Sequence, residues 1–500
     1  MFRNNQSTEK NNKNEVKEIV SKENNFWQWF LWILQEARIV DTRYSVKGSY
    51  VWLDWGYKIF RNIYSLAQDA YEQSGHNQMQ FPTLIKEEIF LKETDFIRNF
   101  ENDVFWVDRE GTKALAKGER LALRPTSELI IYPMFNKWIR SWRDLPMKVF
   151  QNVSIFRCET NETRPLIRSR ETIGFIEGHS AFATKEAALE FLKQVWKFYM
   201  KLFNDLGIPV KLIEVPEWEC FAGSTKTIDG YVVLPESKSM ELFTTAYLGT
   251  TFSEIFSIEY LDEQKTKQLA HLLCYGPSID RIIASLIALY GDDRGLKLLP
   301  GIAPKNFIII PIFNRKNRNA ILSYARKVQK HLSTFGFTVE LDDNEITRPG
   351  NKFYRSERFG YPLRIEVGQR EYQNKEMTII RRDTFQKLIF NLDTKNLKRE
   401  IKKLLKQIRK TQQDIVFKDF IERQIDLTCY KTITEAFDHL LLETDRIYLI
   451  NWCGRKVCAE KIESKTNFSL LGYDHESKTI QRLCIVCQSK GHQSVLAKRY

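Results

Sequence analysis

Long apolar segments are missing from this 500-residue sequence. Its apolar runs, such as FIIIPIF at 307–313, are far shorter than the roughly 20 residues that a membrane-spanning helix needs. The N-terminal stretch MFRNNQSTEKNNKNEVKEIVSKENN lacks the apolar core of a secretory signal. Cysteine is also scarce, and eight cysteines in 500 residues exclude a disulfide-dense scaffold. We therefore expect a soluble, cytoplasmic protein without a membrane partner.

The composition is that of a basic globular protein. Lys and Arg total 76 against 63 Asp and Glu, which gives a formal net charge of +13, and 43% of the residues are hydrophobic. Such a chain can bury a sizeable core, and its length predicts about three domains. The positive surplus favours a polyanionic partner such as nucleic acid, although many basic proteins bind none.

Sequence patterns divide the chain into a tail and three regions. The first 25 residues are mostly Asn, Lys, Glu and Ser, so we expect a disordered polar tail at 1–25. Helices alternate with strand-like runs over 26–302, beginning with the apolar segment FWQWFLWILQEARI at 26–39, for which we expect a helix. Residues 303–410 and 411–500 form the second and third regions.

The second region opens with a strand–helix–strand pattern. KNFIIIPIF (305–313) is followed by AILSYARKVQKHLSTF (320–335), whose apolar residues recur every three and four positions, and then by FTVEL (337–341). This pattern predicts a parallel sheet covered by helices, with further strands at 361–368 and 377–382.

A strongly basic segment closes the second region. KNLKREIKKLLKQIRK (395–410) holds eight basic residues and one acid. The basic face of this predicted helix is either solvated or in contact with phosphates, and the sequence alone leaves both open. The opposite face carries the large aliphatic residues Leu397, Ile401, Leu404, Leu405 and Ile408.

Arginine is concentrated in the first region. RPTSE (124–128), FRCE (156–159) and RPLIRSRETIGFIEGH (164–179) follow one another along the chain. The planar guanidinium group clamps phosphate oxygens bidentately, and the glutamates between the arginines can accept from a base or an amine. A network of ion pairs on a sheet is the structural alternative. Four arginines lie within 14 residues: Arg157, Arg164, Arg168 and Arg170.

A second polar cluster lies further along the chain. CYGPSIDR (274–281) leads into the apolar segment IIASLIALYGDDRGLKLLP (282–300). An Arg at the start of a helix lies where backbone N–H groups also attract an anion. By itself, this pattern is more typical of a core helix with a salt-bridged Arg281 than of an anion-binding site.

The ordered combination of these motifs resembles class II aminoacyl-tRNA synthetases and, within that class, prolyl-tRNA synthetases. RPTSE, FRCE with its Arg-rich loop, the turn ending in Arg281, and GDDRGL occur in the family's order. PLRIEVG (362–368) and RRDT (381–384) resemble the family's anticodon-binding domain, and FPTLIKEEIF (81–90) lies where the family has its dimer-interface strand. The resemblance extends from about residue 26 to the C-terminus.

The resemblance implies an α+β fold of three domains. These are a class II catalytic domain on an antiparallel sheet (26–302), an α/β anticodon-binding domain with a basic connecting helix (303–410) and a small α/β zinc-binding C-terminal domain (411–500). It also implies a homodimeric proline–tRNA ligase that makes prolyl-adenylate from L-proline and ATP with Mg²⁺ and then charges tRNA(Pro). The segment between Glu159 and Gly276 leaves no room for a cis-editing insertion.

Individual roles are carried over from the family. Arg157 and Arg281 would be catalytic and would hold the α- and γ-phosphates of ATP. A carboxylate facing the secondary ammonium, and an aromatic wall beside the ring, suit proline. The remaining ATP site would comprise Glu159, Arg168, Ser169, Glu241 and Thr244. The proline site would comprise Thr126, Glu128, Phe175, His179 and Ser278.

Two positions depart from the family pattern in SMELFTTAYLGTTFSE (239–254). Glu241 stands at a Gln position and Ala246 at a His position, whereas Thr244 is retained. These changes leave open a paralogue that activates another small amino acid or charges an acceptor other than tRNA. A non-catalytic tRNA-binding regulator is the third hypothesis, although binding alone does not need the retained residues Thr126, Glu128, Arg157, Glu159 and Arg281.

Two close cysteine pairs lie in the third region. Cys453 and Cys458 are separated by four residues, and Cys484 and Cys487 by two. Two such pairs can converge on one tetrahedral ion, with four buried thiols as the alternative. Together with Tyr500, the pattern resembles the C-terminal domain of archaeal and eukaryotic prolyl enzymes, which implies structural zinc.

The second region should contact the anticodon loop. Single-stranded bases are recognised by stacking and by hydrogen bonds to their edges, and aromatic and basic side chains provide both. The basic helix at 395–410 would add phosphate attraction that weakens as salt rises. Candidate base contacts, each with an alternative as a plain surface residue, are Phe353, Tyr354 and Arg355, with Arg348 and Arg364 nearby.

Overall fold

The computed structural model describes residues 20–90, 104–159, 162–221, 223–235, 238–438, 442–477 and 482–500. Most of the expected polar tail, residues 1–19, lies outside this set. The segment 26–39 forms helix α1 (Phe26–Glu36), as predicted, and buries Trp29 and Phe30 completely. Among the described residues, no helix combines the length and the apolar composition that crossing a bilayer requires.

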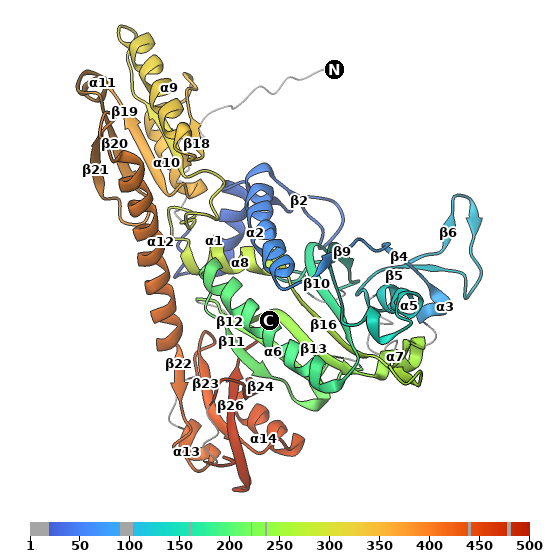
Figure 1. The fold of residues 1–500 in the computed structure, drawn as a ribbon. Helices are drawn as coiled ribbons and strands as arrows, with labels where there is room; N and C mark the ends of the chain where they lie inside the picture. The colour runs from blue at the N-terminus through green and yellow to red at the C-terminus, as the bar shows by residue number, and fades with distance from the viewer. Residues whose placement is uncertain are drawn as a thin grey trace, which may run out of the picture.

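A 12-stranded sheet forms the centre of the molecule (Figure 1). Its neighbouring strands pair antiparallel except for β3–β9 and β22–β23, which are parallel. The strand order is β22 (Gln424–Asp426), β23 (Ile447–Trp452), β26 (Lys490–Ala497), β24 (Ser469–Asp474), β11 (Lys211–Glu214), β12 (Lys226–Val233), β13 (Ser239–Gly249), β16 (His271–Pro277), β10 (Glu171–Phe182), β9 (Met147–Phe156) and β3 (Asn77–Gln78), and β25 (Arg482–Leu483) pairs with β26.

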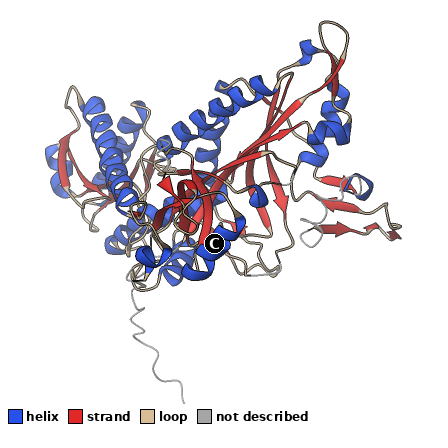
Figure 2. Ribbon diagram, turned by 90° about the horizontal axis from the view of Figure 1, so that it is seen from below, coloured by secondary structure: helices blue, strands red, loops and turns tan. Residues whose placement is uncertain are grey.

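Helices cover both faces of the central strands because successive strand residues point to opposite faces. One face packs against α2 (Asp54–Gln73), α6 (Lys185–Leu206) and α8 (Ile279–Tyr290), and Phe150 and Tyr275 point into this core. The adjacent residues Val149 and Cys274 point to the other face, which packs against α5 (Glu128–Trp138) and α7 (Thr251–Phe256). Figure 2 shows helices packed along the long strands of the sheet.

The predicted strand–helix–strand unit is confirmed in the second region. Strand β17 (Phe307–Pro311) pairs parallel with β18 (Val339–Leu341) after helix α9 (Arg318–Thr334). Strands β19 (Leu363–Val367), β20 (Glu376–Arg381) and β21 (Lys387–Asn391) complete a five-stranded sheet in the order β18-β17-β19-β20-β21. Helices α10 (Pro349–Phe359) and α11 (Gln369–Asn374) connect its strands.

The basic segment lies in one long helix, α12 (Leu397–Glu422). Its five predicted core residues, from Leu397 to Ile408, are all buried, so the aliphatic face was predicted correctly. The helix runs from the five-stranded sheet to the C-terminal strands (Figure 1). The predicted domain boundary at residue 410 therefore falls inside a continuous helix.

The C-terminal strands extend the central sheet. Strand β24 pairs with β11 through Ile213–Asp474 and Glu214–Tyr473, and a 2.7 Å ion pair between Lys211 and Asp474 lies at the same junction. The third region was expected to be a separate small domain, but its strands continue the catalytic sheet. Helices α13 (Ile433–Phe437) and α14 (Lys456–Thr466) pack beside these strands.

Smaller elements surround the large sheet. The segment expected at a dimer interface forms β4 (Leu84–Lys86) and α3 (Glu87–Phe90), and β4 pairs with β8 (Leu121–Leu123), which also pairs with β5 (Phe105–Val107). Three two-stranded sheets complete the fold: β1 (Val40–Asp41) with β2 (Val51–Trp52), β6 (Arg109–Glu110) with β7 (Lys113–Ala114), and β14 (Glu259–Leu261) with β15 (Lys267–Leu269).

A buried arginine joins the second region to the GDDRGL turn of the first. The guanidinium of Arg382 donates to both carboxylate oxygens of Asp292, at 2.6 and 3.0 Å, and to the backbone oxygen of Glu357 at 3.2 Å. Burial disfavours the charge of Asp292, but the contacts with Arg382 outweigh it and lower the pKa of this carboxyl. The indole of Trp29 donates to the backbone oxygen of Asp292, so α1 meets the same turn.

Replacing Arg382 with Met should therefore lower stability by about 2–4 kcal/mol, because it leaves Asp292 without its main partner in a mostly buried site. Thermal unfolding and hydrogen exchange over residues 291–296 would measure the effect. The control is Arg399→Met on the exposed face of α12. Equal melting temperatures and equal exchange in the two variants would contradict the assignment.

Candidate active site

One cavity of about 180 Å³ lies against β9, β10, β13 and β16. These strands bring together residues that are far apart in the sequence. The roles of these residues remain predictions at this point. All twelve residues predicted for the ATP and proline sites line the cavity: Thr126, Glu128, Arg157, Glu159, Arg168, Ser169, Phe175, His179, Glu241, Thr244, Ser278 and Arg281.

The two-residue period of β10 places one row of side chains in the cavity. Phe175, Glu177 and His179 all line it, whereas Ile176 points into the core on the other face. On the paired strand β9, Gln151 lies opposite Glu177. The strand therefore presents an aromatic ring, a carboxylate and an imidazole in sequence along one wall.

The floor of the cavity is a buried hydrogen-bonded carboxylate. The side-chain amide of Gln151 donates to Glu177 Oε1 at 2.8 Å, and His179 Nε2 lies 3.6 Å from Glu177 Oε2. Burial disfavours the charge of Glu177, but the interactions with His179, Ser127 and Gln151 outweigh it and lower its pKa. The floor therefore carries a negative charge that favours a cationic group above it.

A second carboxylate comes from the start of α5. Glu128 is 3% exposed, and the hydroxyl of Thr126 donates to it. Cys274, on β16, also faces Glu128, and burial together with the nearby Glu128 raises the pKa of its thiol well above the usual range. The thiol therefore stays protonated beside this carboxylate.

Several cavity residues were not predicted from the sequence. Cys274 was expected to be only a packed residue, and Phe221 was not considered for the site, but both line the cavity. Cys274 belongs to CYGPSIDR, so its closeness to the predicted Ser278 and Arg281 was the available signal. Phe221 lies on a loop, and its neighbours in the cavity come from strands that are distant in the sequence. Little in the sequence therefore indicated that it would line the cavity.

Two guanidinium groups that line the cavity are held by backbone oxygens. Arg281, in the first turn of α8, donates through Nε to Ile167 O at 3.1 Å and through Nη1 to Glu241 O at 2.9 Å. Arg157 Nε donates to Pro125 O at 3.3 Å. Carbonyl oxygens thus orient both cations, and Arg281 Nη1 also lies 3.5 Å from Glu241 Oε1 on β13.

The other three arginines of the cluster differ in their surroundings. Arg168 donates to Glu159 at 2.7 Å, so the ion-pair alternative describes this pair in the structure. Arg164 lies 4.1 Å from the ring centroid of Trp27, and Arg170 lies 4.7 Å from that of Phe105. These last two arginines pack on aromatic rings outside the cavity lining.

The two departures from the family pattern lie in different environments. Glu241 lines the cavity and accepts from the hydroxyl of Thr244 at 3.2 Å. Ala246 is fully buried in the hydrophobic core beside α5 and α7. Ala246 itself does not line the cavity but lies opposite Cys274, which does, so Glu241 is the departure whose side chain lines the cavity directly.

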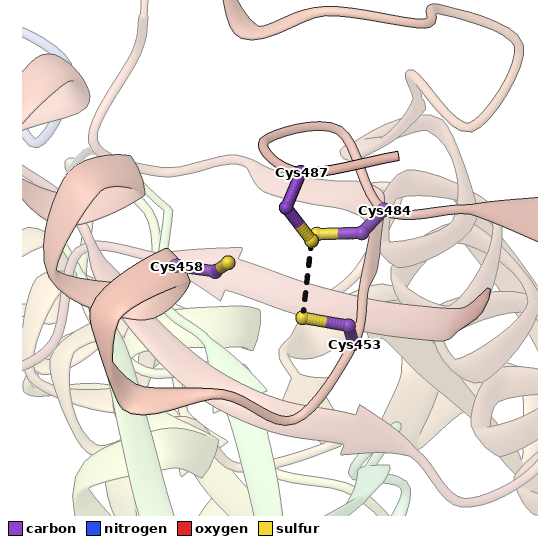
Figure 3. A group of neighbouring side chains, drawn as sticks. All are labelled: Cys453, Cys458, Cys484 and Cys487. Atoms are coloured by element: carbon purple, nitrogen blue, oxygen red, sulfur yellow. Dashed lines mark hydrogen bonds between the residues drawn. The ribbon is translucent and has the colours of Figure 1, made fainter. Parts of the chain in front are cut away.

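The four C-terminal cysteines converge, as Figure 3 shows. Their sulfur atoms all lie within 4.8 Å of one another. Cys453 follows β23, Cys458 lies on α14, and Cys484 and Cys487 lie on the turn after β25. Arg455 donates to Cys453 and Cys487, at 3.4 and 2.6 Å. Four sulfur donors in this arrangement match a tetrahedral zinc site.

The predicted anticodon contacts are only partly exposed. The guanidinium of Arg364 lies 4.5 Å from the centroid of Phe353 and donates to Glu357, so both residues are engaged within the protein. Arg355 is paired with Asp342 and Glu340. Tyr354, at 63% exposure, is the aromatic residue of the set that faces solvent.

Comparisons with known proteins agree over nearly the whole chain. Residues 105–290 match the model of the tRNA synthetase class II core domain (G, H, P, S and T), and residues 306–404 match the anticodon binding domain. The chain is 38% identical to the proline–tRNA ligase of Methanosphaera stadtmanae over 95% of its length and 99% of that protein. It is likewise 38% identical to the Thermoplasma acidophilum enzyme, over 96% and 100%.

A solved structure is similar as well. The prolyl-tRNA synthetase of Giardia lamblia, in complex with prolyl-adenylate, superposes with a TM-score of 0.89 at 30% identity, covering 96% of this chain and 99% of that one. Sequence and structure thus agree on one family over nearly all of the chain. The protein therefore belongs to the prolyl-tRNA synthetase family, in its archaeal type.

Proposed function

We propose that the protein activates L-proline with ATP and transfers it to tRNA(Pro). The observation that carries this proposal is one cavity lined both by the buried carboxylates Glu128 and Glu177 and by the guanidinium groups of Arg157 and Arg281. An amino acid has a cationic amine and an anionic carboxylate, and ATP adds further negative charge. The cavity therefore matches both substrates along its length.

The carboxylate end suits proline. A secondary ammonium placed between Glu128 and Glu177 would make charge-assisted hydrogen bonds, with the Thr126 hydroxyl as a further partner. Phe175 and His179 would flank the flat apolar ring. Ser278, which is 8% exposed and precedes α8, closes the cavity on the same side as Phe175 through a backbone bridge.

The guanidinium end suits ATP bound as its Mg²⁺ complex. Arg157 would contact the α-phosphate and Arg281 the γ-phosphate, with Glu159 accepting from the adenine amino group. Arg168 and Ser169 would line the nucleotide from the loop, and Glu241 and Thr244 from β13. When ATP binds, Glu159 must therefore either give up its hydrogen bond with Arg168 to accept one from adenine, or accept hydrogen bonds from both.

The chemistry needs two displacements. A carboxylate oxygen of proline attacks the α-phosphorus of ATP, and the bond to pyrophosphate breaks. The terminal ribose hydroxyl of tRNA then attacks the prolyl carbonyl and loses its proton, while AMP leaves. Positioning and neutralisation of charge account for such transfers, so Arg157 and Arg281 would act without a nucleophilic side chain.

Glu241 keeps a second candidate open, namely a paralogue that activates another small amino acid. Pyrophosphate exchange across a panel of amino acids should depend on proline alone, because the ring and secondary amine fit the Phe175–Glu128 end. Arg157→Ala should lower the rate at least 100-fold, since it removes a contact to the developing charge. Arg143→Ala, on an exposed turn, is the control.

Preference for another amino acid in this panel would refute the proline assignment. Unchanged exchange in Arg157→Ala would refute the placement of ATP.

The exposed face of α12 is proposed to contact tRNA phosphates. Lys398, Lys402, Lys403 and Lys406 are exposed, and none has a carboxylate partner within 4 Å among the described residues. At 1.5 Å per residue they span about 12 Å of one helix side, which is enough to follow a nucleic-acid backbone. The proximity of α12 to the anticodon-binding sheet supports this surface (Figure 1).

The double variant Lys402→Glu/Lys403→Glu should raise the KM for tRNA about tenfold or more and flatten its salt dependence, because phosphate contacts are lost. Proline-dependent pyrophosphate exchange should not change. Lys193→Glu/Lys197→Glu on α6 is a matched control. An unchanged KM for tRNA would mean that the basic face of α12 is solvated and does not contact tRNA.

We propose that the four-cysteine cluster holds one structural zinc ion. The donor set fits, since four sulfurs lie within 4.8 Å of one another and Arg455 offsets part of their charge when they are thiolates. When bound, zinc would fasten α14 to the turn after β25. None of the four cysteines lines the catalytic cavity, so the role assigned to the zinc is structural.

Cys484→Ser should lower the zinc content from one per chain toward zero and reduce the melting temperature by several degrees, because the fourth sulfur ligand is lost. Metal analysis and thermal unfolding measure the two effects. Cys429→Ser, an exposed cysteine outside the cluster, should leave both unchanged. Zinc-free wild-type protein of full stability would contradict the site.

We further propose a cytoplasmic homodimer. Leu84 on β4 is 48% exposed, which is consistent with an uncovered apolar residue at the family's dimer strand. All eight cysteines are free thiols in the structure, as a reducing compartment favours.

A further inference from the structure

Tyr50 lies between the two segments that carry the nucleotide-facing arginines. Its hydroxyl donates to Asp280 Oδ2 at 2.7 Å and accepts from the hydroxyl of Ser169 at 3.2 Å. Asp280 immediately precedes Arg281 on α8, and Ser169 immediately follows Arg168 on the Arg-rich loop. One phenol therefore links both segments, and neither the motifs nor the carried-over roles include it.

The same N-terminal segment contacts the Arg-rich loop a second time. The backbone N–H of Arg170 donates to Gly48 O at 3.0 Å. Gly48 has a φ of +77°, and a Cβ at this position would lie 2.7 Å from Cγ of Arg170. The close approach needs glycine, so the segment 48–50 lies against the loop at two fixed points.

Asp280 depends on Tyr50 for a side-chain partner. Its side chain is 1% exposed, and its Oδ1 lies close to Gly174, where an added Cβ would be 2.9 Å away. Burial raises the pKa of this carboxyl to about 7, so a hydrogen-bond donor matters to its charged form. The phenol of Tyr50 provides this donor at 2.7 Å.

Arg281 makes a second contact between α8 and the Arg-rich loop. Its Nε donates to Ile167 O at 3.1 Å, one residue before Arg168. The loop is therefore held against α8 by two separate links, one through the arginine itself and one through Tyr50. The first link uses the guanidinium of Arg281, which would also contact ATP, whereas the second runs through the phenol of Tyr50, which does not line the cavity.

We infer that Tyr50 is a positioning residue for ATP, which sets the distance between Arg168 and Arg281 by bridging Ser169 and Asp280. This inference rests on the proposed function of the cavity. Tyr50 itself does not line the cavity, so it acts through the residues that do.

Tyr50→Phe removes only the hydroxyl and keeps the ring, so the fold should be retained. It should raise the KM for ATP in proline-dependent pyrophosphate exchange about three- to tenfold, as expected for the loss of one or two hydrogen bonds. The KM for proline and the melting temperature should stay at the wild-type values. Tyr57→Phe, an exposed tyrosine on α2, is the matched control.

A double-mutant cycle with Ser169→Ala isolates the bridge. If Tyr50 acts through Ser169, the effects of the two changes on the KM for ATP will be less than additive. An unchanged KM for ATP in Tyr50→Phe, strictly additive effects, or a parallel rise of both KM values with a lower melting temperature would each overturn the inference.

Calorimetric binding of a non-hydrolysable ATP analogue distinguishes a failure of the proposed function from a failure of the inference about Tyr50. If the wild-type protein binds the analogue but shows no proline-dependent exchange, the proposed function is refuted. The affinities of the two tyrosine variants for the analogue can still be compared. A weaker affinity in Tyr50→Phe than in Tyr57→Phe would then still support the bridge, and equal affinities would refute it.

Discussion

The antiparallel pairing of β10 with β9 and β16 is the constraint on which the cavity depends. Because side chains alternate along these strands, one face receives aromatic core residues such as Phe150 and Tyr275, and the other receives Glu177 and His179. A shift of one residue in this register would exchange the two sets. The large core under α2, α6 and α8 therefore fixes the position of every polar group on the opposite face.

The cavity lining holds negative and positive charge in different ways. Glu177 is buried but keeps its charge through hydrogen bonds from neighbouring side chains. The guanidinium groups of Arg157 and Arg281 are oriented by carbonyl oxygens. Both arrangements are held by contacts within the protein, so little reorganisation is needed when charge develops in the reaction.

Local patterns in the sequence predicted much of this molecule. The aliphatic face of α12 and the strand–helix–strand unit of the second region follow from periodicity, which is a local property. The residues lining the cavity were predicted through motifs whose spacing and order resemble a known family. Their roles, in contrast, remain proposals, because a lining position does not show which substrate atom is contacted.

Non-local pairing set the limit of prediction. Nothing in the sequence near Asp474 indicated that β24 would pair with β11, some 260 positions earlier. Tyr50 was missed for the same reason, since both of its partners are distant in sequence.

The junction of β24 with β11 has a consequence for biosynthesis. Because β11 emerges from the ribosome long before β24, its outer edge lacks its native neighbour while roughly the next 250 residues are made. An unpaired strand edge can recruit other chains, so a prematurely terminated product would be prone to self-association. Translation of the last strands thus protects the catalytic sheet as well as completing it.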